Sequence, residues 1–271
     1  MDGRKLVLVT GANTGLGFQI VKALCGSNTD YEVLVGGRSI KKAEQAIKTL
    51  KEEFPSSHLH AIQVDVEDDI SISSAFEHVN NKYGKLDALI NNAGESETQG
   101  AQFDQQRDAG KMSTRDIWNK TYDVNVTGTH ILTWHFAPLL LKSSDPRLMF
   151  IASGTSSLNT SLDPNFPVNK QPAKGWPKTL TNFDLPAYRS SKTGMNMMMR
   201  EWARLLGQDG VKVWAISPGY LATGLGVGQE QNKEQGAIDP AIGAAIVKDV
   251  LEGGRDRDVG QVVSRQGIQP W

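Results

Sequence analysis

The stretch KLVLVTGANTGLG (residues 5–17) joins a run of apolar, β-branched residues to a glycine-rich turn, and Gly17 to Leu24 then have the apolar spacing of a helix. Glycines permit a tight bend and a close approach of the backbone to a phosphate. The N-terminus of the helix adds N–H groups and a partial positive charge. The stretch predicts a strand, a turn and a helix, and the turn is either a dinucleotide-binding loop or a plain connection.

The same order of strand and helix recurs about seven times along the chain. Strands are predicted at 5–10, 31–38, 58–66, 86–94, 147–153, 211–219 and 260–264, with helical patterns at 39–54, 70–84, 125–141, from about 187, and near 240–251. The strands are almost continuously apolar, as in parallel sheets that are buried on both faces. We therefore predict an α/β fold, a Rossmann-type doubly wound parallel sheet of about seven strands in three layers, α/β/α. Because no linker divides the chain, residues 1–271 are predicted to form one domain.

Composition excludes several classes of function. The 271 residues include 29 Lys and Arg against 30 Asp and Glu, so no basic field favours nucleic acid or a membrane surface. Neither a signal-peptide pattern nor an apolar run of about 18 residues occurs, so we expect a cytoplasmic protein that acts on small molecules. The histidines form no metal-binding motif, and no metal is predicted. The one cysteine, Cys25, excludes an internal disulfide and is expected to be a buried thiol.

The end of the second predicted strand bears on the cofactor. It reads LVGGRS (residues 34–39), where an acidic residue would hold the 2′-hydroxyl of an adenosine ribose and repel a 2′-phosphate. Gly36 and Gly37 supply no acid, whereas Arg38 supplies a planar fork suited to phosphate. NADP(H) is therefore favoured over NAD(H). The alternative is that Arg38 is a solvated residue before a helix capped by Ser39.

The stretch PAYRSSKTGM (residues 186–195) sets Tyr188 four residues before Lys192 at the start of a predicted helix. Residues i and i+4 share one face of any helix. The pair alone therefore fits either acid–base chemistry or an ordinary helix surface.

Seven motifs follow one another in order along the chain: TGANTGLG (10–17), Asp65 with Val66, NNAG (91–94), Asn125 in VNVTG, Ser153 in FIAS, the tyrosine and lysine of YRSSK (188–192), and PGYLAT (218–223). Together they resemble the short-chain dehydrogenase/reductase family, in its compact single-domain branch, over almost the whole chain. The resemblance implies an oxidoreductase that uses a nicotinamide cofactor.

The resemblance also implies roles for four residues. Tyr188 is the general acid in reduction and the general base in oxidation, and Lys192 favours its phenolate form and hydrogen-bonds the nicotinamide ribose. Ser153 orients the substrate oxygen, and Asn125 holds a water that links Lys192 to solvent. The alternative for Asn125 is a buried helical amide with its hydrogen bonds satisfied.

Several other assignments stay open. Ser156 and Ser157 are rivals of Ser153, which is preferred because it directly follows the apolar run of its strand. Asp65 fits a turn, Asn91 and Asn92 fit structural support, and Thr223 fits a helix N-cap. The implied cofactor-binding residues are Gly11, Asn13, Thr14, Gly15, Leu16, Gly17, Arg38, Ser39, Asp65, Val66, Asn92, Ala93, Gly94, Tyr188, Lys192, Pro218, Gly219, Leu221 and Thr223.

The predicted function is reduction of a ketone or aldehyde to an alcohol, or the reverse reaction. The cofactor supplies a hydride, and the oxygen that gains charge needs a proton. One alternative is an imine or iminium reductase, for which Tyr188 matters less because the substrate arrives protonated. Another is a catalytically silent NADP-binding sensor or scaffold, which has no need of the tyrosine and lysine pair.

The chain departs from the family pattern in two places. Residues 154–187 separate Ser153 from Tyr188, and they resemble the longer insertions of carbonyl-reductase-like members, which cover a helix face used for subunit association. Both a monomer and a homo-oligomer therefore stay open. Thr14 stands where many NADP-preferring relatives carry a basic residue, which leaves Arg38 to bind the 2′-phosphate largely alone.

Three stretches break the strand and helix pattern: 95–112, 154–187 and 222–238. All three follow predicted strands at the carboxyl edge of the sheet, where loops commonly carry specificity. They are predicted to form the walls of the substrate site, with plain surface insertions as the alternative.

Overall fold

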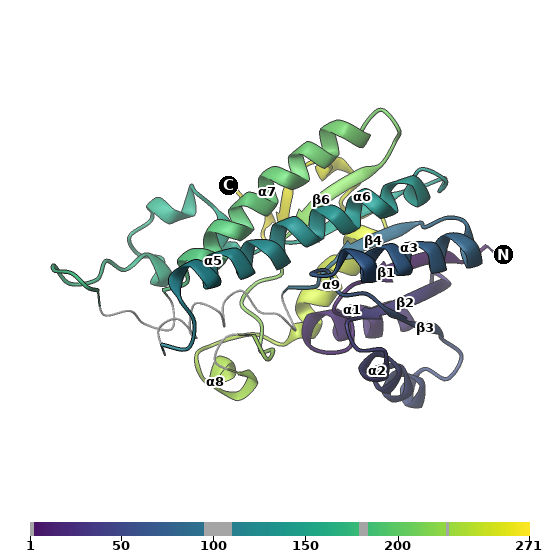
Figure 1. Ribbon diagram of the computed structural model, residues 1–271, viewed down its shortest axis with the longest axis horizontal. Coiled ribbons are helices and arrows are strands. Elements are labelled where there is room, and N and C mark those ends of the chain that lie inside the picture. Colours follow the sequence, from purple (N-terminus) through teal and green to yellow (C-terminus); the bar gives the residue numbers. More distant parts are fainter. Residues whose placement is uncertain (1–2, 95–109, 179–183, 226–227) are drawn as a thin grey trace.

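The computed structural model describes residues 3–94, 110–178, 184–225 and 228–271. Its centre is one eight-stranded sheet in the order β3-β2-β1-β4-β5-β6-β7-β8, in which β1 to β7 are parallel and β8 is antiparallel to β7 (Figure 1). The strands are β1 (Lys5–Val9), β2 (Tyr31–Gly37), β3 (His58–Gln63), β4 (Ala88–Asn91), β5 (Arg147–Ile151), β6 (Lys212–Ile216), β7 (Val262–Ser264) and β8 (Gly267–Ile268).

Helices cover both faces of this sheet. They are α1 (Gly15–Cys25), α2 (Ile40–Glu53), α3 (Asp69–Tyr83), α5 (Thr114–Tyr122), the π-helix η1 (Asp123–Gly128), α6 (Thr129–Leu140), α7 (Pro186–Leu206), α8 (Gln229–Glu234) and α9 (Pro240–Leu251). Figure 1 shows α3, α6 and α7 side by side along one face. None of the helices in the described ranges is long and apolar enough to span a membrane.

Alternation along β1 shows why the strands are apolar throughout. Leu6 and Leu8 pack into one core with α3, α6 and α7, whereas Val7 and Val9 pack into the other with α1, α2 and α9. Successive side chains of a strand point to opposite faces, so both sets are buried. The predicted Rossmann-type three-layer fold is therefore confirmed.

The structure refines two details of the predicted elements. The sheet has eight strands, because Gly267–Ile268 adds a two-residue antiparallel edge strand that is too short to give a periodic signal. The helix expected at 125–141 is part of a longer helical run that begins at Thr114, and its middle is a π-helix. A π-helical turn admits one extra residue per turn, so it shifts the face on which the following side chains lie.

A charged cluster lies at the amino ends of the strands, where β5 and β6 begin. Arg147 donates to Asp256 at 2.7 Å and to Asp145 at 3.1 Å, and Lys212 donates to both carboxylates. Partial burial opposes ionisation of Asp145, but the hydrogen bonds from Lys212, Arg147 and Lys5 outweigh it and hold the pKa of that carboxyl well below its usual range. This cluster ties the amino ends of the strands together and leaves the carboxyl ends for a ligand.

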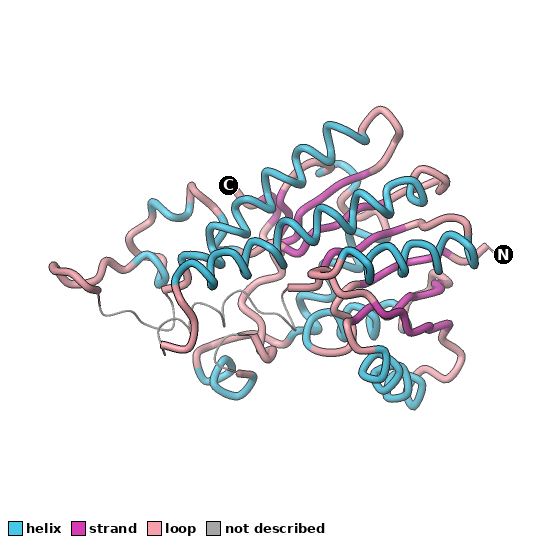
Figure 2. Tube along the Cα trace, in the orientation of Figure 1, coloured by secondary structure: helices cyan, strands magenta, loops and turns pink. Residues whose placement is uncertain are grey.

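The predicted substrate loops are described only in part. Of 95–112, residues 95–109 lie outside the described residues, as do 179–183 of the second loop and 226–227 of the third. From Gly154 to Asn169 the second loop contains three short 3-10 turns, η2 (Gly154–Ser156), η3 (Thr160–Leu162) and η4 (Pro167–Asn169), and it extends to one side of the sheet near the start of α7 (Figure 2).

Arg189 of α7 holds this loop. Its guanidinium donates to the carbonyl of Thr155 at 3.3 Å, to that of Val168 at 3.0 Å and to Asn169 Oδ1 at 2.8 Å. Burial lowers the pKa of Arg189 from its ordinary value. The residue next to Tyr188 therefore fixes the loop that the sequence analysis assigned to the substrate wall.

Candidate active site

The glycine-rich turn lies between the carboxyl end of β1 and the start of α1. Gly11 and Gly15 have φ values of 59° and 56°, which favour glycine. A Cβ at Gly17 would lie 2.3 Å from the carbonyl oxygen of Gly11 and 2.9 Å from Cα of Ala12. These are backbone atoms that cannot move aside, so the close packing of helix on turn requires glycine at position 17.

Asn92 and Thr10 hold this turn against the end of β4. The Thr10 hydroxyl accepts from the backbone N–H groups of Asn92 at 3.0 Å and Ala93 at 2.9 Å. The Asn92 amide donates to the carbonyls of Thr10 at 2.8 Å and Gly11 at 3.1 Å. These contacts match the structural support expected of Asn92. Thr10 was missed, because its partners lie more than 80 residues away in the sequence.

The turn has features that fit a dinucleotide. Thr14 occupies the N-cap of α1 without a side-chain cap, and the first turn of the helix contains no acidic residue. Asn13 Oδ1 is buried with no hydrogen-bond partner among the described residues. Leu16, by contrast, is a buried member of the hydrophobic core.

The end of β2 is shaped by its glycines. A Cβ at Gly36 would lie 2.8 Å from the carbonyl of Val9, and one at Gly37 would lie 3.1 Å from Asn13 Oδ1. Arg38 follows on the exposed side, and its carbonyl accepts from Gln63. Ser39 sits at the N-cap of α2 but makes no side-chain cap bond, and the exposure of Arg38 agrees with the alternative of a solvated residue before that helix.

Asp65 and Val66 follow β3. The Asp65 carboxylate accepts from the N–H of Glu67 at 3.2 Å, which is the turn contact that the sequence left open. Val66 is buried, and its carbonyl lies so near Gly128 of η1 that a Cβ there would overlap it. The predicted adenine contact of these two residues stays a prediction.

Asn125 lies in η1, between the end of β4 and α7. Its amide donates to Ser191 Oγ at 3.0 Å, while its Oδ1 is buried with no partner among the described residues. Gly94 has a φ of 100°, and a Cβ there would lie 2.4 Å from Asn125 Oδ1. Among the described residues the amide oxygen is thus unsatisfied, and both the satisfied-amide alternative and the water-binding role stay predictions.

Tyr188 and Lys192 lie on the first turns of α7 and face the interior. Tyr188 is 5% exposed and Lys192 is 0% exposed, so they do not form an ordinary helix surface. Lys192 Nζ donates to the carbonyl of Ile151 at 2.7 Å and lies 5.8 Å from the centre of the Tyr188 ring. A buried ammonium needs such partners, and these place it where β5 ends.

The segment after β5 packs against the same part of α7. Thr193 Oγ1 donates to the carbonyl of Ser156 at 2.8 Å, and the Asn196 amide donates to Ser156 Oγ at 3.0 Å. With the bond from Lys192 to Ile151, these contacts flank Ser153 on both sides. The structure thus brings the Ser153 segment and the Tyr188 helix together.

Hydrogen bonds distinguish Ser153 from the two alternative candidates, Ser156 and Ser157. Ser156 Oγ is buried and donates to the carbonyl of Ser153 at 2.6 Å, and the buried Ser157 Oγ accepts from the N–H of Thr160 at 2.9 Å. Ser153 is half-buried, and its hydroxyl lies 2.9 Å from Thr155 Oγ1. Its oxygen also accepts from the backbone N–H of Thr155 at 3.2 Å, so the hydroxyl hydrogen can be donated either to Thr155 Oγ1 or to another acceptor.

Gln269, in the C-terminal segment, was missed by the sequence analysis. Its amide donates to the carbonyl of Ser153 at 3.2 Å, and its backbone N–H donates to Val262. Only the turn from β7 into the unpredicted strand β8 brings the residue there, so no local sequence signal could have found it.

The loop after β6 carries the last predicted motif. Gly219 has a φ of 100°, and Leu221 forms an isolated bridge with Ile238. Pro218 packs so closely on Gly243 that a Cβ there would lie 3.1 Å from the Pro218 side chain. Thr223 does not cap a helix, since α8 has Gly228 at its N-cap and Thr223 Oγ1 accepts from Leu225 N–H, so that alternative is wrong.

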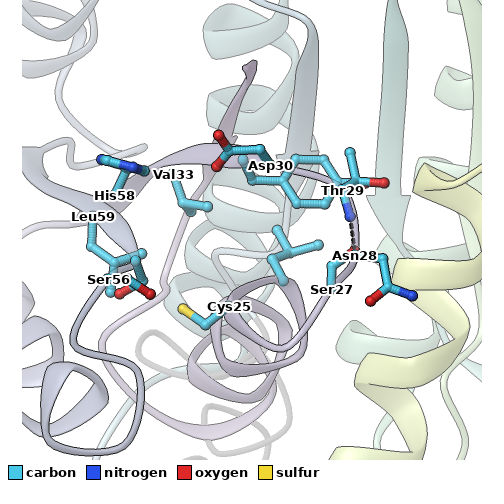
Figure 3. A pocket seen from close by; sticks show the side chains of 12 residues that line it. Cys25, Ser27, Asn28, Thr29, Asp30, Val33, Ser56, His58 and Leu59 are labelled. Atoms are coloured by element: carbon cyan, nitrogen blue, oxygen red, sulfur yellow. Dashed lines mark hydrogen bonds between the residues drawn. The ribbon is translucent and has the colours of Figure 1, made fainter. Parts of the chain in front are cut away.

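A pocket of about 200 Å³ lies beside the amino ends of β2 and β3, whereas the predicted motifs lie near the carboxyl ends of the strands (Figure 3). Thr29 N–H donates to Ser27 Oγ at its rim. Cys25 lines it and is half-buried, so the expectation of a buried thiol was wrong. Burial raises the pKa of the Cys25 thiol, which keeps it protonated and poorly nucleophilic. The pocket is therefore separate from the predicted motifs.

The sequence also resembles those of known proteins. The sequence matches the short chain dehydrogenase family over residues 5–182 and 178–234. The chain belongs to the short-chain dehydrogenase/reductase family. This short-chain dehydrogenase is therefore an oxidoreductase of the kind that uses a nicotinamide cofactor and acts on small molecules.

Relatives of this short-chain dehydrogenase match it over nearly its full length. The short-chain dehydrogenase/reductase tropE of Talaromyces stipitatus is 42% identical over 275 residues, with 100% of this chain and 99% of that protein covered. The corresponding eupG of a Phoma species is 43% identical over 278 residues, with 98% and 97% covered. In structure, the NADPH-bound carbonyl reductase from chicken fatty liver matches with a TM-score of 0.76 at 23% identity and 99% coverage of both chains.

Proposed function

We propose that this short-chain dehydrogenase reduces a ketone or aldehyde of a small organic or secondary metabolite with NADP(H), or catalyses the reverse oxidation. The observation that supports this best is the burial of Tyr188 and Lys192 beside the Ser153 segment. Burying a lysine side chain completely is costly. A sensor or scaffold gains nothing from that arrangement.

The proposed chemistry assigns one task to each side chain. NADPH, when bound, supplies the hydride. The Tyr188 hydroxyl donates a proton to the substrate oxygen as that oxygen gains negative charge. The positive charge of Lys192 favours the phenolate that Tyr188 leaves behind. Ser153 donates a hydrogen bond to the same oxygen and orients it. The Thr155 hydroxyl then donates a hydrogen bond to the serine oxygen.

Asn125 has a supporting part in the same proposal. Its buried Oδ1, without a partner among the described residues, can accept a hydrogen bond from a water. Such a water, held close to the end of β4, would connect Lys192 with solvent and return the proton to Tyr188. One domain over residues 1–271 would hold these parts together, with the substrate walls at 95–112, 154–187 and 222–238.

The cofactor-binding part of the proposal rests on the glycine-rich turn and the end of β2. Gly11, Gly15 and Gly17 let the backbone approach a pyrophosphate at the uncapped N-terminus of α1. Arg38 stands where an acidic residue would repel a 2′-phosphate, and it is exposed. The chicken carbonyl reductase that shares the fold was solved with NADPH bound, in line with this preference.

Removing the guanidinium tests the cofactor preference. We expect Arg38→Ala to raise the KM for NADPH about tenfold and to leave the KM for NADH nearly unchanged, because a charge-assisted contact to the 2′-phosphate contributes roughly 1.5–3 kcal/mol. Lys48→Ala, which removes an exposed charge from the far end of α2, is the control and should alter neither value. Equal KM values for the two cofactors in the wild-type protein would contradict the preference.

The reaction itself is tested with a panel of ketones, aldehydes and cyclic imines, each assayed for NADPH consumption. We expect turnover with carbonyl compounds. Tight NADPH binding without turnover on any of them would point instead to a sensor or scaffold.

A further inference from the structure

Asn232 of α8 directs its whole side chain at the loop that follows β6. Although α8 is short and mostly exposed, Asn232 is only 3% exposed. Its Nδ2 donates to the carbonyls of Thr223 at 3.0 Å and Leu225 at 2.6 Å, and its Oδ1 accepts from the Tyr220 hydroxyl at 2.8 Å. One amide thus joins three positions of the same loop.

Other hydrogen bonds also hold this loop, among them one from Thr223 N–H to the carbonyl of Leu221 at 2.8 Å. Backbone bonds from Ile238 N–H to Tyr220 at 2.9 Å and from Ala222 N–H to Ile238 at 2.8 Å hold its first half. Beyond Ala222, the hydrogen bonds that fix the carbonyls of Thr223 and Leu225 come from Asn232. Asn232 therefore fixes the backbone of this half of the loop, while the Thr223 side chain accepts from Leu225 N–H at 3.3 Å.

The chemistry at position 232 is specific. A carboxamide offers two N–H donors and one acceptor oxygen at the same carbon, which matches two carbonyls and one hydroxyl. A carboxylate of the same shape offers only acceptors and would face the two carbonyl oxygens with negative charge.

We propose that Asn232 is a positioning residue, which acts through the backbone of Thr223 and Leu225 to hold the loop over residues 218–225 in the form that binds the nicotinamide cofactor. The proposal rests on the proposed function, since it takes this loop as a cofactor contact. It assigns to the third predicted wall, 222–238, a role in cofactor affinity in addition to substrate contact.

The test compares Asn232→Asp with Gln208→Glu, which adds the same charge at an exposed position in the turn between α7 and β6. The dissociation constant for NADPH is measured by fluorescence titration without substrate, together with kcat at saturating NADPH and the melting temperature. For Asn232→Asp we expect about a tenfold weaker NADPH affinity, equivalent to the loss of roughly one or two hydrogen bonds, with kcat changed less than about threefold. Gln208→Glu should match the wild type.

A milder variant keeps the test informative if Asn232→Asp fails to fold. Tyr220→Phe removes the hydroxyl that donates to Asn232 Oδ1 and keeps the ring, and we expect NADPH affinity to fall by roughly twofold to fivefold. If both folded variants bind NADPH as the wild type does, or if melting temperature and kcat fall together while affinity is unchanged, Asn232 is merely structural and the inference is wrong. Wild-type protein that binds neither NADPH nor NADH would overturn the proposed function as well.

Discussion

Ketone reduction by the Tyr188→Phe variant is expected to be slower than that of the wild type by a factor of about 10² to 10⁴, the range supplied by a positioned general acid. The variant keeps the buried ring and removes only the hydroxyl, so the packing of α7 and the bond from Lys192 to Ile151 should persist. The measurement is steady-state NADPH consumption with a ketone substrate, along with NADPH affinity, which should change little.

A matched control for this variant is Tyr31→Phe. Tyr31 is also 5% exposed, and it lies at the amino end of β2, far from the glycine-rich turn. It should keep wild-type activity. Full ketone activity in Tyr188→Phe would show that the proton comes from another group. If Tyr188→Phe loses ketone reduction but keeps imine reduction, the imine substrate supplies its own proton.

Gly17→Ala is expected to weaken NADPH binding by on the order of a hundredfold, since overpacking against fixed atoms costs about 1–3 kcal/mol or more. The new methyl group would lie 2.3 Å from the carbonyl of Gly11 and 2.5 Å from Nδ2 of Asn92. Relief of these overlaps must push α1 away from the turn that cradles the pyrophosphate. Fluorescence titration with NADPH measures the effect.

Gly26→Ala at the other end of α1 separates this effect from helix stability. A Cβ there would lie 3.6 Å from the Phe54 ring and 3.9 Å from the carbonyl oxygen of Lys22, both of which are ordinary contacts. We expect it to bind NADPH like the wild type. Equal NADPH affinity in Gly17→Ala and Gly26→Ala would mean that the turn is a connection and the cofactor binds elsewhere.

The fold could be predicted because its signal is local. Each strand is a short apolar run, each helix has its own apolar stripe, and the alternation of the two restricts the topology. The edge strand Gly267–Ile268 escaped prediction because two residues carry no period, and the π-helical turn around Asn125 escaped because its sequence resembles that of any helix.

Only the parts of the candidate site that belong to sequence motifs could be predicted. Tyr188 and Lys192 could be found by their spacing, but their burial depends on the packing of α7 against the end of β5. Thr10, Gln269 and Asn232 act on segments that are distant in the sequence or lie across an irregular loop. Hydrogen bonds of that kind follow from tertiary structure, and a single sequence does not contain them.

Transfer of deuterium from NADPH labelled at the reactive C4 position tests the central claim most directly. The labelled cofactor is incubated separately with each ketone, aldehyde and cyclic imine of the panel, and the products are analysed by mass spectrometry and NMR. The proposed reaction predicts one deuterium on the carbon of the new alcohol, and no such product from Tyr188→Phe on the same time scale. Deuterium on a carbon bound to nitrogen, or on no product at all, would contradict a carbonyl reductase.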